Sequence, residues 1–231
     1  MLKLIKLEMK KFKMRSYIKG ALITHLILLL FMLLPIHIQK YENDIFYEDF
    51  TMTFTLIDTI VKITFMVFAS VLIARFIIEE YRNGTITLLF TYPISRKKLI
   101  TAKLIIIAVF TFVNIIISNL TITYVLLQCN YFWDFIPGEL TTSLLLTSLI
   151  KVFINALTST FMALIPLYFG MRRNSVSTTI LSSLIMVAIV CSNNNGDSLS
   201  SIVAIPIILA VIGALIAYLA VRKTEYLDVT K

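Results

Sequence analysis

The chain contains few charged residues and few residues that break helices. Of its 231 residues only 15% are charged, whereas 58% are hydrophobic, and it holds six glycines and five prolines. A typical soluble domain carries about 25% charged residues, and the mean hydropathy here is +0.90. The composition therefore excludes an ordinary soluble domain and indicates a protein that lies mostly in lipid.

The motifs of several functional classes are also missing. None of the six glycines begins a GxxxxGK[ST] phosphate-binding loop, so this chain is not expected to hydrolyse ATP. Cys129 and Cys191 form no CxxC pair and have no histidine cluster nearby, which favours packing roles over zinc or haem. His25 and His37 lack ligand spacing, and Gly84 occupies the arginine position that a Glu-Glu-x-x-x-Arg intramembrane protease requires. We therefore predict no catalytic, cofactor-binding or metal site in this chain.

The net charge of +8 does not predict nucleic-acid binding. The bases gather at the ends of apolar runs, in residues 1–17, 75–103, 172–173 and 222–223, as expected for segments that set membrane orientation. Acidic residues are concentrated in the segment 42–49, on the opposite side. The chain is therefore predicted to be a multi-pass protein of the cytoplasmic membrane with both termini in the cytoplasm.

Apolar runs recur along the chain, and a spanning helix needs roughly 20 residues. They lack the alternation of a lipid-facing strand, which argues against a barrel. We predict an all-α polytopic membrane protein with one transmembrane domain over 1–231 and six transmembrane helices. The expected spans are 18–38, 54–78, 101–127, 145–169, 178–191 and 201–221.

Two of these spans have open boundaries. The fourth begins either near Leu140, which buries Lys151, or near Leu149, which places Lys151 at the outer interface beside a short external helix over 139–148. The fifth has only about 14 residues, which is short for a straight span, and is expected to extend into neighbouring serines. No segment outside the spans exceeds about 20 residues, which leaves no room for a soluble catalytic domain.

The N-terminal segment 1–17 is predicted to form an amphipathic helix that lies in the membrane interface. Its apolar residues recur at helical spacing beside a stripe of lysines, and each lysine favours the anionic cytoplasmic leaflet by roughly 1 kcal/mol. The alternative is a simple anchor that obeys the positive-inside rule. The apolar stripe consists of Leu2, Ile5, Met9 and Phe12, and the basic stripe of Lys3, Lys6, Lys10 and Lys13.

Ionisable and amide side chains inside two spans mark a candidate substrate path. Asp58 and Lys62 are one helical turn apart in the outer half of the second span, and Lys151 and Asn155 have the same spacing in the fourth. Such residues occur in secondary transporters, although the chain shows no internal repeat of three spans. The alternative role is structural, with the lysines snorkelling outward or holding neighbouring helices together.

The most polar connection, 79–98, carries the most specific signal. It reads EEYRNGTITLLFTYPISRKK and resembles the signature of ABC-2 type transporter permeases, in which Glu-x-x-x-Gly-Thr precedes a hydrophobic run, Pro-[Ile/Val]-[Ser/Thr]-Arg and a lysine. That family often has arginine after the glutamate, where this chain has Tyr81 followed by Arg82. Chain size, basic N-terminal helix and number of spans are also similar, so the resemblance covers the whole chain. The matching positions are Glu80, Gly84, Thr85, Pro93, Ser95, Arg96 and Lys103.

The order of residues in this connection predicts a turn, a short helix and a helix restart. Gly84 can adopt a positive φ that turns the chain, and Thr85 can then cap a short amphipathic helix. Pro93 ends that helix, and Ser95 caps the third span. Arg96 and the two lysines after it are expected to meet the anionic lipid surface. The apolar face of the short helix consists of Ile86, Leu89 and Phe90.

The resemblance implies the membrane-spanning subunit of an ABC exporter. In that family the short helix is a coupling helix that fits a groove on a separate ATP-binding subunit, which holds ATP and Mg²⁺, and two like or related permeases form a dimer. A hydrophobic or amphipathic peptide, lipid or drug is the expected substrate, with peptide export or self-protection the first expectation. The implied coupling residues are Glu79, Glu80, Arg82, Gly84, Thr85, Ile86, Leu89, Phe90, Pro93, Ser95 and Arg96.

A local latch is also expected at this connection, in which Glu79 or Glu80 pairs with Arg82, Arg75 or an N-terminal lysine. Two alternatives to an exporter stay open: a non-transporting membrane scaffold that anchors a partner through the same helix, and a secondary transporter. A third interpretation is a solvated loop that merely obeys the positive-inside rule. Such a loop needs bases, but it does not need this order of glycine, threonine, proline and serine.

Overall fold

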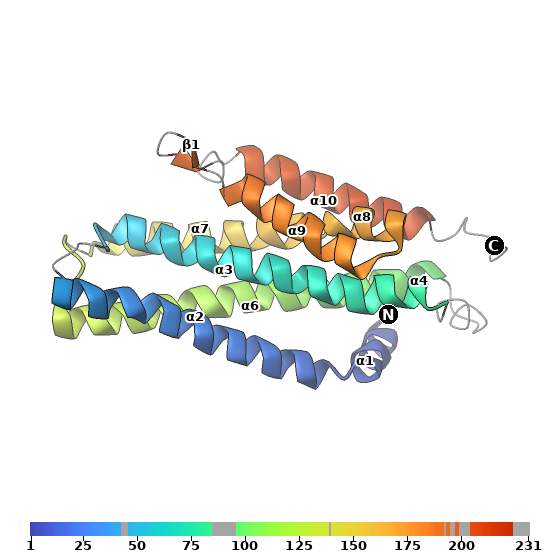
Figure 1. The fold of residues 1–231 in the computed structure, drawn as a ribbon, viewed down its shortest axis with the longest axis horizontal. Helices are drawn as coiled ribbons and strands as arrows, with labels where there is room; N and C mark the ends of the chain where they lie inside the picture. The colour runs from blue at the N-terminus through green and yellow to red at the C-terminus, as the bar shows by residue number, and fades with distance from the viewer. Residues whose placement is uncertain are drawn as a thin grey trace. The chain divides into compact units, whose positions relative to one another are not determined.

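The computed structural model describes residues 1–42, 46–84, 96–138, 140–191, 193–194, 197–198 and 204–223. Nearly all of them are helical (Figure 1), which confirms the predicted all-α class. The strands of this described part are two residues long each, β1 (Asn193–Asn194) and β2 (Asp197–Ser198), and they pair antiparallel.

Long helices follow one another along the chain, with short helical pieces between them. A π-helical segment, η1, joins α3 to α4 without a break, so these three elements form one continuous helix up to Arg82. The helices are α1 (Leu2–Lys11), α2 (Met14–Glu42), α3 (Phe50–Ile73), η1 (Ala74–Ile78), α4 (Glu79–Arg82), α6 (Arg96–Trp133), α7 (Thr142–Met162), α8 (Pro166–Arg173), α9 (Val176–Cys191) and α10 (Ala204–Lys223).

Five helical segments are long and apolar enough to cross a membrane. They overlap the first four predicted spans and the sixth. The fifth predicted span corresponds to α9, whose apolar part, Val176–Val190, is shorter than these segments. The described chain is therefore a multi-pass helical protein, and the count of six spans stays a prediction. The five segments are Met14–Ile36, Phe50–Arg82, Lys97–Trp133, Thr142–Arg173 and Ile205–Arg222.

The start of α7 decides one of the open boundaries. The helix begins at Thr142 and runs through Lys151, so residues 142–148 continue into the span instead of forming a separate helix. The side chain of Lys151 is exposed from the rest of the chain on this helix. Whether the membrane buries Lys151 stays a prediction.

The chain divides into two compact units, which are described separately. The first unit consists of Met1–Met14, Phe65–Phe112 and Leu157–Lys231, and the second of Arg15–Thr64 and Val113–Ala156. The helices α3, α6 and α7 each contribute residues to both units.

In the first unit, η1 lies at the centre of the packing. Its residues Ala74, Phe76, Ile77 and Ile78 have no exposed surface. Both α8 and α9 pack against it, and these two helices also lie side by side (Figure 1). A Cβ atom at Gly170 of α8 would lie 2.2 Å from Thr179 Oγ1 and 2.9 Å from Ile78 Cδ1, so glycine is what permits this close approach.

The polar connection is described at its two ends. Gly84 follows α4 with a φ of +66°, which confirms the predicted positive-φ turn. α6 begins at Arg96, directly after Ser95. The predicted coupling helix between them stays a prediction, because residues 85–95 lie outside the described residues. That segment contains Thr85, Ile86, Leu89, Phe90, Pro93 and Ser95.

In the second unit, Tyr47 ties the segment before α3 to α2. Its side chain has no exposed surface, and its hydroxyl donates to the Met32 carbonyl at 2.6 Å. Pro35, three residues later in α2, has no N–H to donate to the Phe31 carbonyl one turn earlier. Tyr47 therefore adds a hydrogen bond at the carbonyl next to the one that the proline leaves without its helical donor.

We expect Tyr47→Phe to lower the free energy of unfolding by about 1 kcal/mol, because it removes one buried hydrogen bond without changing the ring. Burial raises the pKa of Tyr47 to about 12 from its usual 10.0. The phenol therefore ionises first in the unfolded chain, so its contribution is present below pH 10.0 and is lost as the pH rises toward 12. The melting temperatures of the native and variant proteins in detergent should converge over that interval. A difference in melting temperature between the two proteins that stays constant over this pH interval contradicts the role given to the Tyr47 hydroxyl.

Candidate functional site

A lysine with no exposed surface lies at the start of α6. Lys103 is fully buried in the first unit, among the buried residues Ile100, Leu104 and Ile107 of the same helix. An ammonium group removed from water is strongly destabilising unless carboxylates and hydrogen-bond acceptors surround it. Other groups of the first unit must therefore balance the positive charge of Lys103.

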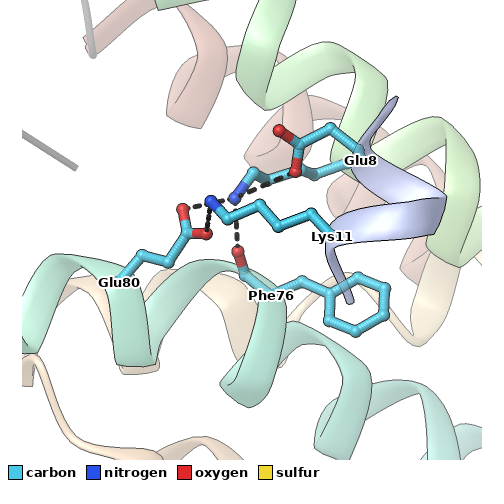
Figure 2. Close-up of polar contacts among 5 residues, drawn as sticks. Glu8, Lys11, Phe76 and Glu80 are labelled. Atoms are coloured by element: carbon cyan, nitrogen blue, oxygen red, sulfur yellow. Dashed lines mark hydrogen bonds and ion pairs between the residues drawn. The ribbon is translucent and has the colours of Figure 1, made fainter. Parts of the chain in front are cut away.

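Three elements supply the partners of Lys103 (Figure 2). Its ammonium group pairs with the Glu80 carboxylate of α4, donates to the Phe76 carbonyl of η1 at 2.8 Å, and lies 3.5 Å from Glu8 Oε2 of α1. The other Glu80 oxygen pairs with Lys11 of α1. We call Glu8, Lys11, Phe76, Glu80 and Lys103 the Lys103 cluster. It contains two carboxylates and two ammonium groups, so its formal charge is balanced.

Local sequence explains how each partner reaches the cluster. Glu8 and Lys11 are three residues apart on α1, which places them on one face of that helix. Phe76 lies inside the π-helical segment, where the backbone ladder changes from i→i−4 to i→i−5 bonding. Glu80 follows one turn later and is 6% exposed. The continuous helix η1–α4 thus presents a carbonyl and a carboxylate to the same ammonium group.

Aromatic contacts hold α1 against η1 at the same place. The rings of Phe12 and Phe76 stack with centroids 4.1 Å apart. The Lys103 ammonium lies 4.7 Å from the centroid of the Phe12 ring, within the range of a cation–π contact. The N-terminal helix is therefore joined to η1, α4 and α6 by ionic and aromatic contacts together.

The structure makes two of the pairings expected for the latch. Glu80 pairs with an N-terminal lysine, Lys11. Glu79 pairs instead with Arg75, whose Nη1 lies 3.2 Å from Glu79 Oε2 at an exposed position. Arg82 is exposed at the end of α4. The two adjacent glutamates thus differ: Glu80 lies inside the buried cluster, and Glu79 lies on the surface.

A second polar cluster lies in the second unit. Asp58 Oδ2 accepts a hydrogen bond from Asn155 Nδ2 at 2.8 Å and lies 3.3 Å from Lys62 Nζ. Sequence analysis predicted these three residues as a candidate site, and the fold brings them together. Lys151, predicted with them, is exposed one turn before Asn155. We call Asp58, Lys62 and Asn155 the Asp58 cluster.

Sequence reasoning missed the participation of Glu8 and the central place of Lys103. The available signals were a single acid among the bases of segment 1–17 and a single lysine inside the apolar run LITAKLIII. It also missed a contact in the second unit, where His25 Nε2 lies 3.1 Å from Asn114 Oδ1 and Nδ1 meets the Ser118 hydroxyl. A histidine inside an apolar span was the signal for that contact.

Metal binding is not supported where the structure describes the chain, since no group of three or more His, Cys, Asp or Glu side chains there is arranged to hold an ion. Cys129 is a half-buried free thiol, and its predicted packing role stays a prediction. The side chain of Cys191 lies outside the described part.

We expect Lys103→Met to lower the free energy of unfolding by about 3–5 kcal/mol, because it leaves two buried carboxylates without their shared cation. Arg75→Ala is the matched control: it breaks an exposed pair, and should change stability by at most about 1 kcal/mol. Thermal unfolding of both variants in detergent measures the difference. Adding Glu8→Gln to Lys103→Met should recover part of the loss, since it removes one uncompensated charge. If Lys103→Met is as mild as Arg75→Ala, the cluster does not stabilise the fold.

The chain is similar to the proteins of one known family. A family model described as "ABC-2 family transporter protein" matches residues 4–193, a range that contains both polar clusters. The chain is also similar to the uncharacterized protein YcbO of Bacillus subtilis (strain 168). The two are 41% identical over 225 residues, which cover 97% of this chain and 99% of YcbO. No solved structure was found to match.

Proposed function

Because the chain belongs to the ABC-2 family of transporter proteins, we propose that it is the permease subunit of an ATP-binding cassette exporter. Family membership makes it a membrane transporter subunit. Our proposal adds that a separate ATP-binding subunit drives it through the connection 79–98. The observation that supports this is the Lys103 cluster, which fixes the root of that connection to the N-terminal helix.

A coupling element must be stiff where it joins the membrane helices. Glu80 is held by Lys11 and Lys103, and it lies four residues before Gly84, where the chain turns. A displacement of the connection therefore moves α4 together with α1 and the start of α6, because separating them would expose paired buried charges. The geometry suits the transmission of a push from a partner to several membrane helices at once.

The remaining parts of the proposal come from the family and from the sequence. ATP and Mg²⁺ bind the partner subunit, and two permease chains, like or related, form the membrane part. Both termini and the connection 79–98 lie in the cytoplasm, six helices span the cytoplasmic membrane, and the basic residues of α1 contact anionic lipids. A hydrophobic or amphipathic molecule moves outward, with a peptide as the first expectation.

A membrane scaffold is the second candidate, because a helix rooted in a rigid cluster also serves to anchor a partner without transport. A secondary transporter is the third, favoured by the ionisable Asp58 cluster inside a span. Transport that depends on ATP and on a co-purifying ATPase supports the exporter. Partner binding without transport supports the scaffold, and transport driven by an ion gradient alone supports the secondary transporter.

We expect a reading frame for a Walker-type ATPase beside the gene for this chain, and we expect that ATPase to co-purify with the permease. Glu80→Ala and Phe90→Ala should reduce both co-purification and ATP-dependent export. Gly84→Ala should act in the same direction, since a φ of +66° is strained for alanine by about 1 kcal/mol. Arg75→Ala, at an exposed ion pair, is the control that should retain both activities.

Size-exclusion profiles of these variants separate a coupling defect from misfolding. Phe90→Ala is the sharper probe, because it lies outside the Lys103 cluster and leaves those ion pairs in place. If Glu80→Ala and Phe90→Ala leave ATPase binding and export intact, the coupling role of the connection is wrong.

A further inference from the structure

The part of α3 that lies in the second unit has one face on which most of its polar side chains lie. Threonines and charged residues recur there every three or four positions, starting from the first turn of the helix. The threonines near the start are exposed, whereas Asp58 and Lys62 are 8% and 5% exposed. The polar face therefore runs from the exposed first turns of α3 to the buried pair of Asp58 and Lys62. This face consists of Thr51, Thr55, Asp58, Thr59 and Lys62.

The part of α7 in the same unit has a matching face. Ser143, Thr147, Lys151 and Asn155 follow one another at intervals of four residues, and the first three are exposed. Side chains on the opposite side of this helix are apolar and also exposed, with Leu149 at 48% and Phe153 at 55%. This part of α7 therefore exposes a polar stripe as well as apolar surface that suits lipid.

The two polar faces meet at the Asp58 cluster. Asn155 and Lys62 both contact Oδ2 of Asp58, at 2.8 and 3.3 Å. The other carboxylate oxygen, Oδ1, is buried and has no hydrogen-bond partner among the described residues. The cluster thus pairs its charges but leaves one acceptor unused.

The position of the Asp58 cluster along its membrane span bears on how Asp58 Oδ1 is solvated. Lys151 and Asn155 lie nine and 13 residues after Thr142, the first residue of their candidate span, which is about 14 and 20 Å along the continuous helix α7 and within the roughly 30 Å of a hydrocarbon core. Hydrocarbon offers no donor to a carboxylate oxygen, and an exposed lysine such as Lys151 is unfavourable against lipid tails. Both observations are accounted for if water reaches this side of α3 and α7.

We propose that the polar faces of α3 and α7 line a water-accessible path that enters from the outer side and ends at the Asp58 cluster, where uncharged polar groups of a transported molecule bind. This inference rests on the proposed permease function. Asp58 and Lys62 neutralise each other, so a charged ligand group would lose its hydration without gaining a counter-charge. A neutral amide or hydroxyl group instead donates to Asp58 Oδ1 and accepts from Lys62.

Cysteine accessibility in the full-length protein tests the path. With Cys129→Ser and Cys191→Ser as background, Asn155→Cys and Thr59→Cys are compared with Ile154→Cys, which lies at the depth of Asn155 on a different face. Methanethiosulfonate reagents are added from the outside to proteoliposomes of known orientation. We expect the two polar-face cysteines to react about tenfold faster than the control, because the reactive thiolate is disfavoured in hydrocarbon. Equal rates at positions 154 and 155, with position 59 also slow, overturn the path.

Reagents of different charge test the ligand class at the same position. A neutral methanethiosulfonate should modify Asn155→Cys faster than a cationic or an anionic one, after each rate is normalised to free thiol. A clear preference for either charged reagent shows that the end of the path selects charge, and overturns the neutral class. These labelling measurements contain no ATPase, so their outcome does not depend on ATP-dependent coupling. The co-purification experiment tests that coupling separately.

Discussion

The first unit depends on how one buried ammonium group is compensated. Lys103 has no exposed surface, and its partners come from α1 and from the continuous helix η1–α4, which are far apart in the sequence. Removing any of these elements leaves a charge in a medium that cannot solvate it. The position of α1 against η1 and α4 is therefore set by charge as well as by the stacked Phe12 and Phe76 rings.

The two polar clusters differ in how many elements they join. In the Lys103 cluster, charges are balanced, and the ammonium group also contacts a backbone carbonyl and an aromatic ring. Each cluster holds one buried carboxylate oxygen without a hydrogen-bond partner among the described residues, Glu8 Oε2 in the first and Asp58 Oδ1 in the second. The Lys103 cluster joins α1, η1, α4 and α6, whereas the Asp58 cluster joins α3 to α7. This difference supports a mechanical role for the Lys103 cluster.

Much of the fold could be predicted because hydrophobic length along one chain reports membrane helices directly. Asp58, Lys62 and Asn155 were predictable as a site because ionisable and amide groups are rare inside apolar spans. The Lys103 cluster was not predictable as a whole, because Glu8 and Lys103 are 95 positions apart and no periodicity connects them. The π-helical turn at Ala74–Ile78 was also missed, since it changes hydrogen bonding without changing composition.

In the proposed mechanism, the position of the Lys103 cluster explains how a push on a short connection reaches the membrane helices. A force applied beyond Gly84 reaches the membrane helices through α4, and α4 begins with one glutamate on the surface and one inside the cluster. The surface glutamate, Glu79, is paired with Arg75 in water and resists little. Glu80 cannot move without carrying Lys11 and Lys103, because their separation would leave buried charges unpaired. In the proposed mechanism the partner's push therefore reaches α1 and α6 through Glu80, whereas the pair of Glu79 and Arg75 transmits little of it.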